Sequence, residues 1–158
     1  MKERIEAALA AAAKQAFEDL CFMFETPELA EQQAALAPAA AAEVKFRGAF
    51  SGKLVLLVSP DLYPAIATNM LGEKDPTPRQ MEDALCEMAN VICGNVVPEL
   101  ALGNPGYLIE TPRVTGTDLE THGLLGMAMA SCRLNLDRGR ADALMFVDGY
   151  FTREEPRP

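Results

Sequence analysis

The spacing of apolar residues switches between a helical and a strand period along this 158-residue chain. Apolar side chains recur every three to four residues over 3–25, and a short helix is expected at 28–36, so helices should occupy most of 1–36. A linker is expected at 37–42. The spacing then approaches two residues in EVKFRGAF and KLVLLVS, which predicts a hairpin with its turn at 51–52.

Two helices should follow this hairpin. The first, in PDLYPAIATNMLG, has Ser59 as its expected N-cap and Gly72 as its stop. The second should begin directly after Thr77, because Thr77 and Gln80 form a capping-box pattern around a proline at the first helical position. This second helix should run into the 90s, where Pro98 would end it or kink it.

The last third of the chain returns to strand character. A short strand in YLIETPRVTG is broken at Pro112, and 124–136 and 141–151 are expected to be long apolar strands joined as a hairpin. The charged, proline-rich tail at 152–158 should fray. The whole pattern predicts a single domain over 1–158 of the α/β or α+β class, with helices packed on a mainly antiparallel sheet.

Charge and residue types exclude several functions. A net charge of −9 argues against binding to nucleic-acid phosphates or to an anionic membrane surface. No stretch is long and apolar enough to predict a membrane span. The single histidine, His122, and the four cysteines lack the spacing of a metal site, and Cys86 and Cys93 are too far apart on one helix to form a disulfide. We therefore expect that the protein binds no metal or cofactor of its own. We also expect that it is cytoplasmic and that its cysteines are reduced.

One face of the helix predicted from Pro78 onward carries polar residues in register. Asp83, Glu87, Asn90 and Gly94 follow i, i+4, i+7 and i+11, opposite an apolar stripe that would face the core. A glycine inside a helix is less favourable than alanine by about 1 kcal/mol, and close approach of another backbone is one reason to keep it. Because any surface helix has a polar face, periodicity alone leaves a solvated face and a docking surface both open.

The stretch EDALCEMANVICGN resembles the E-x-x-N helix of the CheX/CheC/FliY family of chemotaxis phosphatases. Glu87 and Asn90 fall on the two motif positions, and 94–95 matches the Gly-Asn that usually follows. The upstream FRGAFSGKLVLLVSPDLYPAIATNMLG is similar to the family's hairpin and helix, and the downstream TPRVTG is similar to its proline-containing strand. The resemblance covers residues 44–150 and implies a CheC-like fold.

The resemblance also implies a substrate, the aspartyl phosphate of a CheY-like response regulator in chemotaxis or related two-component signalling. Asn90 would orient the attacking water, since a carboxamide both donates and accepts hydrogen bonds without becoming charged. Glu87 would pair with a lysine of the partner. Gly94 would be a further docking contact, and Mg²⁺ would be held by the response regulator. Asp83 lies on the same face but outside the two motif positions, so it is either a docking contact or part of a solvated face.

The first helix departs from the two-site pattern of CheC-type relatives, because Glu18 is followed three residues later by Cys21 rather than asparagine. This predicts one site per chain, as in CheX-like members. Those members are typically homodimers that join their sheets, and the strands near 124–134 and 141–151 would either supply that edge or be central strands. The aromatic cluster in FEDLCFMFE is expected to belong to the core.

Two other functions stay open from the sequence. A non-catalytic adaptor or flagellar-switch component of the same fold would use the same helix to bind a response regulator without hydrolysis. A small-molecule enzyme with Glu87 as its general base is less favoured, because no nucleophile, histidine or phosphate-binding loop accompanies that carboxylate.

Overall fold

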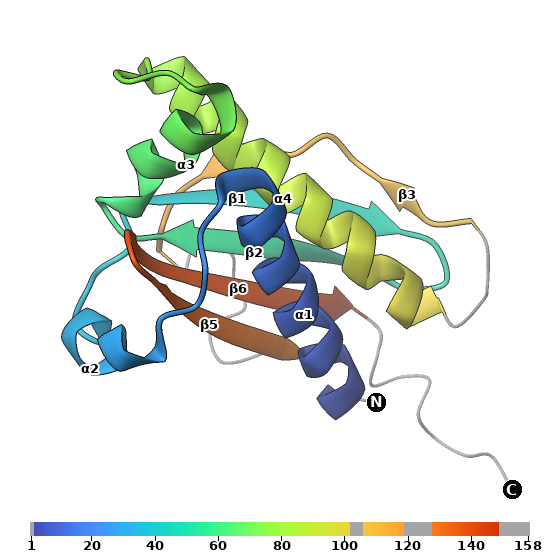
Figure 1. Ribbon diagram of the computed structural model, residues 1–158. Coiled ribbons are helices and arrows are strands. Elements are labelled where there is room, and N and C mark those ends of the chain that lie inside the picture. Colours follow the sequence, from blue (N-terminus) through green and yellow to red (C-terminus); the bar gives the residue numbers. More distant parts are fainter. Residues whose placement is uncertain (1, 102–105, 119–127, 149–158) are drawn as a thin grey trace, which may run out of the picture.

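A computed structural model describes residues 2–101, 106–118 and 128–148 (Figure 1). The helices and strands follow one another as α1 Lys2–Cys21, η1 Pro27–Leu29, α2 Ala30–Gln33, β1 Ala40–Arg47, β2 Ser51–Val58, α3 Leu62–Leu71, α4 Pro78–Ala101, β3 Leu108–Ile109, β4 Arg113–Thr115, β5 Ala130–Leu136 and β6 Gly139–Asp148. None of the helices in these described ranges combines the length and the apolar character needed to cross a bilayer.

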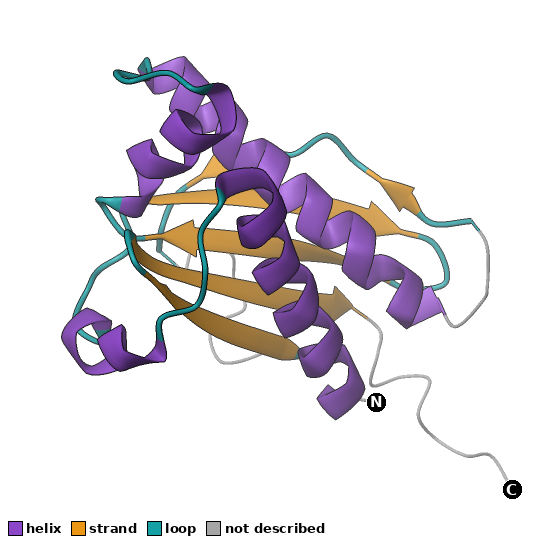
Figure 2. Ribbon diagram, in the orientation of Figure 1, coloured by secondary structure: helices purple, strands orange, loops and turns teal. Residues whose placement is uncertain are grey.

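The strands form one sheet in the order β3-β1-β2-β6-β5, and β4 pairs with the same edge of β1 as β3 does. Every strand pairing in the described residues is antiparallel, which confirms the predicted class (Figure 2). β6 lies between β2 and β5, so it is a central strand and cannot supply the edge of a joined sheet. β5 is the outer strand on that side.

Helices α1 and α4 lie side by side on the same face of the sheet (Figure 1). They run antiparallel, because the Arg4 side chain donates to the carbonyl of Glu99 at 2.7 Å while Cys21 Sγ lies 3.5 Å from Met88 Sδ. One core joins their apolar stripes to alternate residues of the strands, Val44, Leu54 and Met145 among them. The helical period and the strand period therefore meet in one apolar layer.

Helix α1 ends at Cys21, not near residue 25 as the sequence predicts. Phe22 adopts the left-handed conformation with φ of 54°, which is less favourable for a non-glycine residue by about 1–2 kcal/mol. Met23 is buried, but Phe22 and Phe24 are 70% and 59% exposed. The expectation that this aromatic cluster belongs to the core is therefore wrong for two of its members.

The hairpin also differs from its prediction in register. The turn occupies 48–50, and Gly52 lies inside β2, where an added Cβ would collide with the carbonyl of Phe146. Gly52 therefore serves close strand packing and not the turn. β1 begins at Ala40, so the last part of the expected linker is strand.

The helix-capping predictions have mixed outcomes. The Thr77 amide donates to Gln80 Oε1 at 2.9 Å and the Gln80 amide to Thr77 Oγ1 at 3.2 Å, which confirms the capping box. Gly72 ends α3 with φ of 71°, also as predicted. Ser59 is not the N-cap of α3, since Asp61 holds that position and the Ser59 hydroxyl instead accepts from the Arg140 amide at 2.9 Å. Pro98 does not end α4, which continues to Ala101.

The segment between α1 and β1 is tied to the outer end of the sheet. The Thr26 amide donates to Asn135 O, and Gln33 Nε2 to Leu136 O, each at 2.7 Å. The buried Arg140 guanidinium donates to the carbonyls of Gln33 and Ala34 at 2.8 and 2.9 Å and to the carbonyl of Leu36. These bonds satisfy carbonyls at the end of a four-residue helix that could not hold its place by itself.

Candidate functional site

Helix α4 turns one polar face away from the sheet. Its buried side is formed by Ala84, Leu85, Met88, Ala89, Ile92, Cys93, Val96, Val97 and Leu100. Asp83, Glu87 and Gly94 are exposed and Asn90 is partly exposed, all on the opposite side. The helix thus places the four residues singled out from the sequence on one accessible surface.

Within the described part of the chain, the Glu87 and Asn90 side chains have no hydrogen-bond or ion-pair partner. Asn95, by contrast, donates from Nδ2 to the Val91 carbonyl at 3.0 Å. Asp83 faces Arg79 one turn earlier at 4.0 Å, but both side chains are at least 75% exposed and such pairs contribute little. Glu87 and Asn90 lie three residues apart, so both side chains are available to a single partner.

Packing among the described residues gives Gly94 no reason to be a glycine. Apart from its chain neighbours and the backbone of its own helix turn, a Cβ built on it would meet no atom of the described residues within 4 Å. Alanine would therefore fit in this helix and would favour it by about 1 kcal/mol. The bare backbone at this point lies one turn after Asn90 on the exposed face.

The surface around Glu87 and Asn90 differs from a small-molecule site. Four surface hollows of about 180–450 Å³ are lined by described residues, and neither side chain lines any of these four. Among the residues that the structure describes, no cluster of three metal-binding side chains occurs. An exposed carboxamide and carboxylate on a long helix suit a macromolecular partner better than an enclosed ligand.

The other face of the sheet holds a charged cluster that the sequence reasoning missed. Glu43 is 2% exposed and lies 2.6 Å from Arg113 Nε and 3.7 Å from Lys53 Nζ. Burial alone raises the pKa of Glu43, but the hydrogen bond and charge of Arg113, with Lys53 and Lys45, hold that pKa below its ordinary value. These side chains line a hollow of about 450 Å³. The signal was the alternation of charged residues at 43, 45 and 53 in strands read only for their apolar positions.

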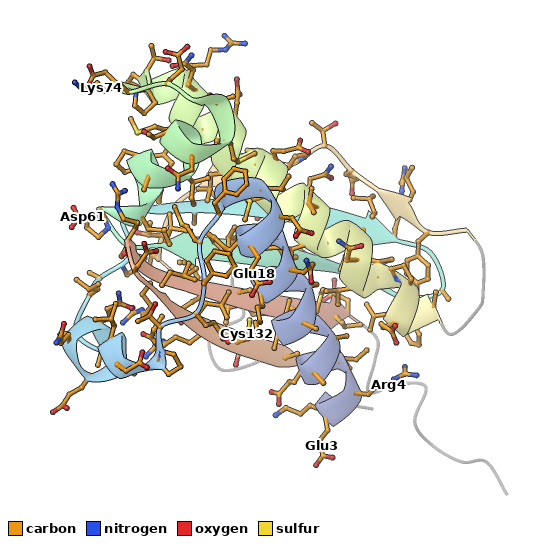
Figure 3. The ribbon with its side chains drawn as sticks, viewed as in Figure 1. Glu3, Arg4, Glu18, Asp61, Lys74 and Cys132 are labelled. Atoms are coloured by element: carbon orange, nitrogen blue, oxygen red, sulfur yellow. The ribbon has the colours of Figure 1, made fainter. Side chains whose placement is uncertain are left out.

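Helix α1 does not repeat the arrangement of α4. Glu18 projects from α1 and is partly exposed (Figure 3), but Cys21 is fully buried against Met88. Burial raises the pKa of the Cys21 thiol to about 12, so it remains protonated. Cys93 is buried as well, whereas Cys86 and Cys132 are only partly so, and all four are free thiols. His122 lies outside the described residues.

The family model of the chemotaxis phosphatase CheX matches residues 40–127, more than half of the chain, including α4 with Glu87 and Asn90. The chain belongs to the CheX family. The resemblance seen in the sequence is thereby confirmed. A search of curated proteins returns no match.

Solved structures of CheX proteins share the fold over nearly the whole chain. A CheX from Desulfovibrio desulfuricans is 13% identical with a TM-score of 0.67, covering 91% of this chain and 99% of that one. A CheX from Vibrio vulnificus is 14% identical with a TM-score of 0.64, covering 94% and 99%. A Borrelia burgdorferi CheX, solved with CheY, BeF₃ and Mg²⁺, is 12% identical with a TM-score of 0.63, covering 89% and 96%. At these identities the likeness establishes a CheC-like fold.

Proposed function

We propose that this chain hydrolyses the aspartyl phosphate of a CheY-like response regulator in chemotaxis or related two-component signalling. One observation carries the proposal: Glu87 and Asn90, the two positions of the E-x-x-N motif, lie side by side on the outer face of α4 with no partner among the described residues. A pair held ready in this way suits a reaction that begins only when the substrate protein docks.

Asn90 is the residue that we assign to the chemistry. Its carboxamide oxygen accepts a hydrogen bond from a water and its amino group donates to a phosphoryl oxygen. The water attacks phosphorus in line, the bond between phosphorus and the aspartyl oxygen breaks, and the aspartate leaves as a carboxylate with inorganic phosphate as the other product. Acyl phosphates are labile, so orienting the water is most of what the side chain must supply.

Glu87 and its neighbours are assigned to docking. The Glu87 carboxylate would pair with a lysine at the response regulator's active site, which fixes the register of the two proteins. Asp83 extends the acidic surface by one turn, and Gly94 lets the partner's backbone come close to the helix. Mg²⁺, in this proposal, is bound by the response regulator and reaches the site with it.

The protein is further proposed to work as a cytoplasmic homodimer. Reduced cysteines suit that compartment. β5 is the outer strand of the described sheet on its side and is the strand that we assign to a joined sheet. The molar mass in solution, measured by light scattering, distinguishes a dimer from a monomer.

The phosphatase proposal is tested with a phosphorylated receiver and Mg²⁺. Purified protein should shorten the lifetime of the receiver's phosphoryl group, and Asn90→Ala should remove that effect. Asn95→Ala is the matched control, because this asparagine lies on the same helix but its amide is bonded to the Val91 carbonyl. If no receiver of the source organism loses phosphate faster than by its own decay, the catalytic proposal fails, and retained receiver binding would then indicate an adaptor.

A further inference from the structure

Two exposed phenylalanines follow α1, one on each side of a buried methionine. Phe22 is 70% exposed and Phe24 59%, while Met23 between them is 1% exposed. Exposed aromatic rings leave a large apolar area in water, which is unfavourable for the isolated chain. Aromatic side chains are also the residues that most often dominate protein–protein binding energies.

The backbone holds Phe22 in its exposed position. Its φ of 54° is a conformation in which glycine or asparagine is usual at the end of a helix. The Met23 amide donates to the Phe17 carbonyl at 3.0 Å, and Asn69 Nδ2 donates to the Cys21 carbonyl at 2.7 Å. The chain is thus fixed on both sides of Phe22, so less conformational entropy is lost when a partner binds.

The chain that carries these rings leaves α1 beside the helix of the candidate site and then runs to the end of β5, where Glu25 pairs with Leu136. Cys21, directly before Phe22, packs its sulfur 3.5 Å from that of Met88, and Met88 directly follows Glu87. Figure 1 shows the end of α1 resting beside the first half of α4. A protein that covers Glu87 and Asn90 would therefore also meet the chain that follows α1.

The surroundings of the two rings are acidic. Exposed carboxylates on the adjoining parts of α1, α4 and the chain after α1 are Asp19, Glu25, Glu82, Asp83 and Glu87. Two of these carboxylates face a cation, Glu25 with Lys14 at 3.9 Å and Asp83 with Arg79 at 4.0 Å, and the other three have no ion-pair partner among the described residues. The complementary surface has an apolar centre flanked by lysines or arginines.

We propose that Phe22 and Phe24 are an apolar anchor that docks the response regulator on which Glu87 and Asn90 act. The inference rests on the proposed function for its partner and assigns the two rings to affinity, not to chemistry. The left-handed conformation of Phe22 keeps its ring outside the core. The exposed carboxylates near the two rings favour a receiver that carries cations around its apolar patch.

Phe22→Gly gives the sharpest test, because glycine suits the left-handed conformation and removes only the ring. We expect its unfolding midpoint in urea to stay the same or rise, the KM for phosphorylated receiver to rise about tenfold, and kcat to stay unchanged. Phe24→Ala should raise KM in the same way. Leu108→Ala, at an exposed apolar residue on β3, is the matched control and should change none of these quantities.

Binding of beryllofluoride-loaded receiver with Mg²⁺, followed by fluorescence anisotropy, separates docking from hydrolysis. If Asn90→Ala abolishes turnover while Phe22→Gly and Phe24→Ala keep KM and affinity within about twofold, the anchor is wrong and the phosphatase proposal stands. If no receiver is hydrolysed but both phenylalanine variants weaken binding, the anchor stands without catalysis. Absence of binding to every receiver of the source organism overturns both.

Discussion

Helices α1 and α4 cover the same face of the sheet in opposite directions, and each places a glutamate three residues before a second side chain. In α4 the pair is Glu87 and Asn90, and both reach solvent. In α1 the pair is Glu18 and Cys21, and the second member is fully buried against the other helix. The same spacing therefore gives two surfaces with different chemical capacity.

The difference arises from how each helix is rotated on the sheet. On α1 the buried stripe includes Phe17 and Cys21, so the position three residues after Glu18 faces the core. On α4 the stripe passes through Leu85, Met88 and Ile92, and Asn90 falls outside it. A motif is thus usable only where the core stripe leaves both of its positions exposed.

Asn90→Ala should have the largest effect on the comparison. It leaves α4, like α1, without an exposed carboxamide to orient a water. We expect the receiver dephosphorylation rate to fall about 100-fold or more, the size of effect seen when one positioned polar group is lost. The free energy of unfolding should change by less than about 0.5 kcal/mol, as for other surface substitutions. Retained phosphatase activity would contradict the role of Asn90.

Cys21→Asn tests the comparison on α1, because it gives that helix the same E-x-x-N motif as α4. The amide would enter a fully buried position, so we expect a loss of about 2–4 kcal/mol in stability and no second active site. Urea unfolding and the phosphatase assay measure the two effects. Cys21→Ala, which buries no polar group, should lose less stability, and a gain in activity by the asparagine variant would show that rotation does not decide the site.

Glu87→Gln sharpens the comparison by removing only the charge. We expect KM for phosphorylated receiver to rise about 5- to 20-fold, a loss of about 1–2 kcal/mol in docking, with kcat changed less. The effect should shrink at high salt. Glu99→Gln near the other end of α4 serves as control, and an equal effect of both variants would indicate a general electrostatic field in place of a specific pair.

Gly94→Ala should have the smallest effect of these variants, and it should raise the stability of the protein while it weakens receiver binding. Because no described atom outside the local helix backbone lies within 4 Å of the added methyl, it should stabilise α4 by about 0.5–1 kcal/mol while weakening receiver binding. Gly72→Ala is the contrasting control: its surroundings are equally open, but its φ of 71° should make alanine destabilising. Unchanged receiver affinity in Gly94→Ala would remove this glycine from the docking surface.

Local patterns predicted much of the molecule, and non-local contacts account for most of what they missed. The period of α4, its capping box at Thr77 and the exposed position of Asn90 all follow from residues close in sequence. The prediction that Ser59 caps α3 is wrong because its hydroxyl accepts a hydrogen bond from the Arg140 amide, 81 residues away. The exposure of Phe22 depends on a left-handed residue that no apolar period signals. The roles of Glu87, Asn90, Asp83 and Gly94, like the single domain over 1–158, stay predictions.

The chain between α1 and β1 also protects part of the outer edge of the sheet. An unprotected edge strand invites uncontrolled pairing with other chains. Here the carbonyls of Asn135 and Leu136 at the end of β5 already accept hydrogen bonds from Thr26 and Gln33. Arg140 holds this segment in place through its hydrogen bond to the Gln33 carbonyl. A second copy joining this edge must therefore pair with β5 before Asn135, which limits both the register and the length of any shared sheet.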